Sequence, residues 1–115
     1  MLWSELMAEL DATVLVPSAD FDVQAIAAAD LLSDILASEK ENFIILTGQT
    51  SAPAIRTALA VGALGVVVVR GKTIPQDTID LARNFGIPLA VTGMKMFEAC
   101  VGAGGRMWSS PSSRS

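Results

Sequence analysis

With 115 residues, the chain is long enough to form one domain with a substantial core, but too short for two. Hydrophobic residues make up 51% of the sequence and charged residues 17%, a balance that excludes an intrinsically disordered protein and favours burial of apolar surface between subunits. The net charge is −4, and no lysine or arginine precedes Lys40, so the acidic first third argues against a nucleic-acid partner.

The lengths of the apolar stretches and the residue types that the sequence lacks exclude further classes of protein. Its most apolar stretch, residues 58–69, is shorter than the roughly 18 residues that a membrane-spanning helix needs, and the amino-terminal residues lack the basic start of a secretory signal. We therefore predict a cytoplasmic protein without membrane contact. The chain has no histidine or tyrosine and only one cysteine, Cys100, so we predict no catalytic residue, no metal site and no cofactor.

The first predicted elements are a helix and two strands. A short amino-terminal helix is indicated by apolar residues at helical spacing, namely Leu2, Leu6, Met7 and Leu10. Residues 13–16 are apolar or β-branched and end at Pro17, which predicts a short strand. Small apolar side chains over residues 23–28 predict a second strand.

A helix is predicted to begin at Asp30, whose carboxylate can accept the free backbone N–H groups of Leu32 or Ser33. An apolar stripe follows at helical spacing: Leu31, Leu32, Ile35 and Leu36. Asp30 and Asp34 share one face of this helix, where two carboxylates could bind a divalent metal or take part in acid–base chemistry. We prefer the structural interpretation, in which Asp30 caps the helix and Asp34 lies in its solvated first turn.

Three short apolar runs, residues 43–46, 65–69 and 87–91, dominate the rest of the chain. Continuous apolar character is typical of strands that are buried on both faces of a parallel sheet. The segments between these runs predict helices that begin near Pro53 and Pro75 and end at Gly62 and Gly86. The sequence therefore predicts a small α/β domain with a mainly parallel β-sheet flanked by helices and built from βα crossover units.

A last helix is predicted over residues 95–101, before a glycine-rich break. We expect the domain to span residues 1–103, and the serine-rich residues 104–115 to form a flexible tail. Cys100 is interpreted as a packing residue rather than a redox sensor, because no base lies near it in the sequence.

Polar and basic residues follow three of the predicted strands. Because the carboxyl ends of parallel strands meet at one edge, where helix N-termini present free N–H groups, an anion or a nucleotide could bind there. Helix caps and solvated loop ends explain the same residues without a ligand, and the first loop lacks the lysine of a phosphate-binding loop. The candidate ligand-binding residues are Thr47, Gly48, Gln49, Thr50, Ser51, Arg70, Gly71, Lys72, Thr92 and Lys95.

Several segments together resemble the DRTGG domain family over about residues 1–103. The segment VQAIAAADLLSDIL at residues 23–36 is similar to the core of that family, although Gln24, Ala25 and Ile26 stand where the family has Thr-Gly-Gly. The later order also agrees, with Arg-Gly-Lys after a valine-rich strand, then Gly-Ile-Pro-Leu, then a closing Met-Phe-Glu helix.

The resemblance implies a non-catalytic regulatory module that commonly forms a homodimer. Domains of this family occur fused to phosphotransacetylases and to serine kinases, beside CBS domains in pyrophosphatases, and alone near hydrogenase genes. A partner enzyme of one of these kinds is therefore expected, and the polar residues at the strand ends make a nucleotide or a phosphorylated metabolite the expected ligand. Two alternatives remain open, a purely structural dimerisation or assembly module and, less favoured, an enzyme.

Overall fold

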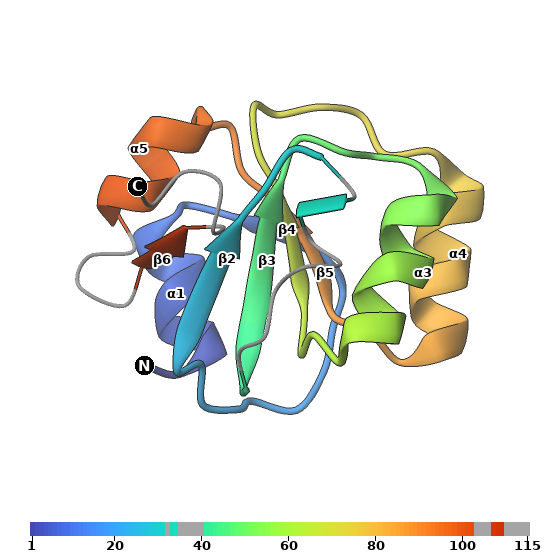
Figure 1. Ribbon diagram of the computed structural model, residues 1–115, viewed down its shortest axis with the longest axis horizontal. Helices are drawn as coiled ribbons and strands as arrows, with labels where there is room; N and C mark the ends of the chain where they lie inside the picture. The colour runs from blue at the N-terminus through green and yellow to red at the C-terminus, as the bar shows by residue number, and fades with distance from the viewer. Residues whose placement is uncertain (32, 35–40, 103–106, 110–115) are drawn as a thin grey trace.

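The computed structural model describes residues 1–31, 33, 34, 41–102 and 107–109, and it shows a β-sheet with helices on both faces (Figure 1). Helices α3 (Ala52–Val61) and α4 (Gln76–Phe85) pack on one face, and α1 (Trp3–Glu9) and α5 (Met96–Gly102) pack on the other. The predicted α/β architecture is thus confirmed.

The sheet is mainly parallel, as predicted. In the described residues it has six strands in the order β1-β5-β4-β3-β2-β6. Parallel pairing joins β2 (Ala25–Ala28), β3 (Phe43–Thr47), β4 (Val66–Val68) and β5 (Leu89–Val91). At one end, β1 (Thr13–Val16) runs antiparallel to β5.

The central strands are buried on both faces, which explains their continuous apolar sequences. All five residues of β3 are buried. Because successive side chains of a strand point to opposite faces, Phe43 and Ile45 belong to the core beneath α3 and α4, whereas Ile44 and Leu46 belong to the core beneath α1 and α5. The helices therefore stabilise the sheet by excluding water from both of its faces.

The predicted helix boundaries are confirmed on the face covered by α3 and α4. Gly62 and Gly86 end these helices with φ of 75° and 70°, in the left-handed conformation that glycine adopts without a steric penalty. Pro53 lies in the first turn of α3, and Pro75 immediately precedes α4. Among the helices described, none is both long and apolar enough to cross a bilayer.

Two predicted segments are described only in part. In the helix predicted to follow Asp30, Ser33 and Asp34 are helical, but Leu32, Ile35 and Leu36 lie outside the described residues. In the predicted tail, β6 (Met107–Ser109) pairs in parallel with β2. These three residues thus form an edge strand of the sheet, and the other residues of the segment 104–115 are not described.

Candidate functional site

The predicted ligand-binding residues lie at the carboxyl edge of the parallel strands. Residues 48–51 follow β3, residues 70–72 follow β4, and residues 92–95 follow β5. The arrowheads of β2 and β3 point to this edge, which is uppermost in Figure 1. The sequence prediction that these three loops share one edge is therefore confirmed, but their side chains do not all reach the same place.

Gly48 is the point at which the first two loops meet. Its amide donates a hydrogen bond of 2.8 Å to Asp30 Oδ1, and its carbonyl oxygen accepts one of 2.8 Å from Lys72 Nζ. A Cβ atom at this position would lie 2.9 Å from Asp30 Oδ1, 3.1 Å from Arg70 Nη2 and 3.3 Å from Lys72 Nζ. The absence of a side chain at Gly48 thus lets the carboxylate and both cations lie close to the backbone, and a larger residue would displace the ends of these side chains.

Asp30 is a member of this cluster, which the sequence analysis did not predict. Its Oδ2 lies 3.5 Å from Arg70 Nη2, and both side chains are about half exposed. The described partners of the carboxylate are thus Gly48 and Arg70, and the predicted capping of Leu32 lies outside the described residues. A signal for this role was present in the sequence, because Asp30 closely follows β2, the neighbour of β3 in the sheet.

Thr47 and Gln49 hold the first loop in place. The Gln49 amide donates to Thr47 Oγ1 at 3.1 Å, and Thr47 is completely buried. The side chain of Gln49 reaches the segment that follows β2, where Nε2 donates to the backbone oxygen of Asp30 at 2.6 Å. Both side chains therefore have structural partners that fix the loop around Gly48.

Thr50 and Ser51 lead into α3, at the end of the helix where backbone N–H groups lack partners within the helix. Ser51 is the N-cap residue and is exposed, and its side chain makes no capping hydrogen bond. The amino-terminal end of α3 is therefore open towards the same edge as Arg70 and Lys72, and its partial positive charge favours an anion there.

Arg70 is held in an unusual backbone conformation. Both Arg70 and Gly71 have positive φ, 68° and 59° respectively, and their amides donate to the carbonyl oxygens of Met94 and Thr92 at 2.7 Å. A left-handed conformation costs a residue other than glycine roughly 1–2 kcal/mol, so these two hydrogen bonds maintain a strained turn. The turn places the Arg70 guanidinium beside Asp30.

Thr92 and Lys95 do not join the cluster. The Thr92 hydroxyl is buried and donates to the carbonyl oxygen of Leu10 at 2.6 Å, which ties the end of α1 to β5. The Lys95 amide donates to Glu98 Oε1 at 3.0 Å at the start of α5, and its side chain is exposed. The prediction that these residues contribute to an anion site stays untested, and Thr92 has a clear structural role instead.

The charges of this cluster suit an anion. Arg70 and Lys72 supply two positive charges and Asp30 supplies one negative charge, so the local balance favours an anionic ligand. Within the described chain, no three acidic or cysteine side chains come close enough to hold a metal ion. Burial raises the pKa of the Cys100 thiol, which lowers its reactivity and agrees with a packing role.

The sequence matches no protein-family model, and a search of curated proteins returns no significant match. A solved structure is similar, namely the CBS and DRTGG domains of the regulatory region of Clostridium perfringens pyrophosphatase, complexed with the activator diadenosine tetraphosphate. The TM-score is 0.69 at 19% sequence identity, and the match covers 84% of this chain and 43% of that one. This chain thus spans less than half the length of that structure. The expected resemblance to DRTGG domains is confirmed at the level of the fold, which this chain shares with the regulatory region of that pyrophosphatase.

Proposed function

We propose that this chain is a regulatory domain that senses an anionic ligand, a nucleotide or another phosphorylated metabolite, and thereby controls a partner enzyme. The observation that carries this proposal is the convergence of Arg70 Nη2 and Lys72 Nζ, 3.1 Å and 3.3 Å from one point above Gly48. Two cations beside the open end of α3 suit the oxygens of a phosphate chain.

Asp30 is a replaceable internal partner of these cations. Its ion pair with Arg70 spans 3.5 Å between half-exposed side chains, and such pairs contribute only about 0–1 kcal/mol. A ligand with several phosphate groups brings more negative charge than one carboxylate, so it can displace Asp30 from Arg70. The proposed ligand is therefore a polyphosphate compound in preference to a singly charged anion.

The comparison with the pyrophosphatase supports the same class of function. That regulatory region is complexed with diadenosine tetraphosphate, an activator that carries a chain of phosphate groups. The likeness extends over most of this chain and concerns the fold. It makes nucleotide polyphosphates the first compounds to test.

The experiment measures melting temperature and heat of binding with diadenosine tetraphosphate, ATP, AMP and inorganic tripolyphosphate. At a ligand concentration of about 100 times Kd, binding stabilises the folded state by roughly 2.7 kcal/mol, which raises Tm by several degrees. We expect this rise for the polyphosphates with the wild type, and its loss with the double variant Arg70→Gln, Lys72→Gln.

Arg83→Gln is the matched control. Arg83 lies in the last turn of α4, away from the carboxyl edge, and its guanidinium forms an exposed ion pair of 3.4 Å with Asp80. This variant loses one positive charge, as each substitution of the double variant does, but should keep the full ligand-induced shift. An unchanged Tm with every compound contradicts the sensing function and favours a purely structural module, whereas equal binding by the double variant shows that the ligand binds elsewhere.

A further inference from the structure

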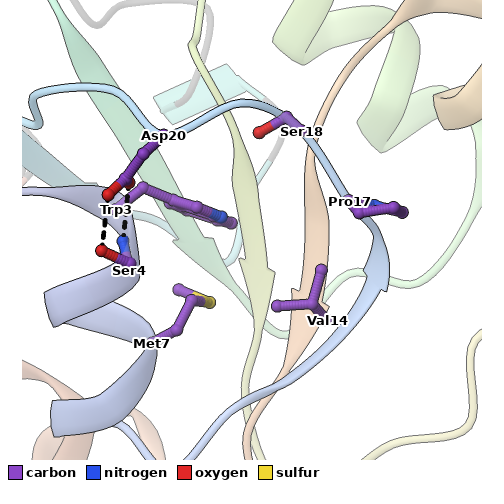
Figure 2. A pocket seen from close by; sticks show the side chains of 7 residues that line it. All are labelled: Trp3, Ser4, Met7, Val14, Pro17, Ser18 and Asp20. Atoms are coloured by element: carbon purple, nitrogen blue, oxygen red, sulfur yellow. Dashed lines mark hydrogen bonds between the residues drawn. The ribbon is translucent and has the colours of Figure 1, made fainter.

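A groove of about 400 Å³ lies between α1 and the chain that leaves β1, on the side of the sheet opposite α3 and α4 (Figure 2). Val14 pairs in register with Ala90, which belongs to the core beneath α1, so the Val14 side chain faces this side as well. Val14 is 41% exposed, which shows that α1 does not cover this part of the sheet. The lining residues are Trp3, Ser4, Met7, Val14, Pro17, Ser18 and Asp20.

The side chain of Trp3 lines this groove and is only 4% exposed. Its ring stacks on Phe21, with the ring centroids 5.2 Å apart, and its indole N–H makes no hydrogen bond to a residue that the structure describes. Figure 2 shows the indole ring pointing into the space enclosed by the lining side chains. Buried indole N–H groups usually have an acceptor, so this donor suits a carbonyl oxygen that enters the groove.

The apolar walls and the charge of the groove indicate which side chains a bound molecule would need. Met7, Val14 and Pro17 present apolar surface that suits an aliphatic side chain. Of the residues that line the groove, Asp20 carries a negative charge and none is a lysine or an arginine. The groove therefore attracts positive charge and repels anions, unlike the edge at Arg70 and Lys72.

Asp20 keeps its negative charge at the end of this groove. Its Oδ2 accepts a 2.6 Å hydrogen bond from the Ser4 hydroxyl, and its Oδ1 accepts one of 3.0 Å from the Ser4 amide. These bonds lower the pKa of the Asp20 carboxyl. The same bonds fix the carboxylate beside Trp3, as the dashed lines in Figure 2 show.

We propose that this groove binds a peptide segment of a partner protein in which an apolar side chain is flanked by lysine or arginine. The apolar side chain lies against Met7, Val14 and Pro17, a backbone carbonyl oxygen of the peptide accepts the Trp3 indole N–H, and a basic side chain lies near Asp20. The site is separate from the proposed anion site and does not depend on it.

The test uses fluorescence anisotropy with three labelled, end-capped peptides, Arg-Leu-Val-Leu-Arg, Glu-Leu-Val-Leu-Glu and Arg-Ser-Thr-Ser-Arg. We expect saturable binding of the first peptide to the wild type, and binding at least about tenfold weaker for the other two. Trp3→Phe keeps most of the ring but removes the donor, and it should weaken binding roughly fivefold.

Val14→Lys and Thr13→Lys separate a groove effect from a folding effect. Val14→Lys places a cation in the groove and should abolish binding, whereas Thr13→Lys adds the same charge at an exposed neighbour on the opposite face of β1 and should leave binding unchanged.

Undetectable binding of the first peptide at millimolar concentration overturns the proposal, and so does equal binding by the two lysine variants. Equal affinity for the acidic peptide also overturns it. If Val14→Lys instead dissociates a dimer of this chain, the occupant is a second copy and the proposal is wrong.

Discussion

At the scale of single residues, Asp30 controls how strongly the cations at the strand ends can attract a ligand. Its carboxylate accepts a hydrogen bond from the Gly48 amide and forms an ion pair with the Arg70 guanidinium. An incoming phosphate would bind the same two groups. The internal carboxylate therefore competes with the proposed ligand. It also lowers the positive charge of the edge when no ligand is bound.

Asp30→Asn should strengthen binding of tripolyphosphate. Asparagine keeps an oxygen for the Gly48 amide but loses the charge that competes for Arg70, so we expect affinity to rise roughly two- to fivefold. Isothermal titration calorimetry measures this change. Asp80→Asn is the control, because Asp80 forms a comparable exposed pair with Arg83 on α4. A fall in affinity for Asp30→Asn would mean that the carboxylate positions Arg70 for the ligand instead of competing with it.

At the scale of the elements, the Asp20 carboxylate helps to hold the segment after β1 against α1. Asp20 accepts hydrogen bonds from the hydroxyl and the amide of Ser4 in the first turn of α1. Hydrogen bonds from Ser4 and from the Phe21 amide lower the pKa of the Asp20 carboxyl from its ordinary value of 3.8. Because only the ionised form accepts all of these bonds, the contact depends on pH.

This contact should stabilise the fold above about pH 4 and lose its effect in acid. The Asp20 carboxyl has a lower pKa in the folded state, so it binds fewer protons when the protein is folded than when it is unfolded. Its contribution to stability is therefore complete above the unfolded pKa. It is lost as the pH falls through the folded pKa. Urea unfolding of the wild type and Asp20→Asn at several pH values measures it. We expect the wild type to be more stable near pH 7, and the difference to shrink as the pH falls through the lowered pKa of the Asp20 carboxyl. A difference that does not vary with pH would contradict the role of the charge.

Most elements could be predicted from the sequence because their signals are local. The apolar runs at β3, β4 and β5, and the glycines at the ends of α3 and α4, carry their own periodicity and turn chemistry. The side-chain partners could not be predicted in this way. Thr92 follows a strand just as Arg70 does, yet its hydroxyl bonds to Leu10, 82 positions earlier in the chain. Asp30 likewise has its partners at Gly48 and Arg70, in loops that follow other strands.

At the scale of the whole molecule, the apolar excess of the sequence leaves large hydrophobic side chains on the surface. The most exposed of them lie on α5, where Phe97 is 78% exposed and Val101, four residues later on the same helix face, is 64% exposed. Leu31, which follows β2, is 61% exposed. Such groups favour an interface between subunits over contact with water.

We therefore predict that the protein forms a homodimer that buries the exposed face of α5. Light scattering after size-exclusion chromatography should give a mass twice the 12.0 kDa of one chain at micromolar concentration. Phe97→Lys should shift this mass to that of the monomer, because a charged side chain at the centre of an interface loses apolar contact and must be desolvated. Phe85→Lys is the matched control, since Phe85 is also exposed, at 43%, but lies at the end of α4. A wild-type mass of 12.0 kDa would contradict dimerisation itself, and a dimer unaffected by Phe97→Lys would place the interface away from α5.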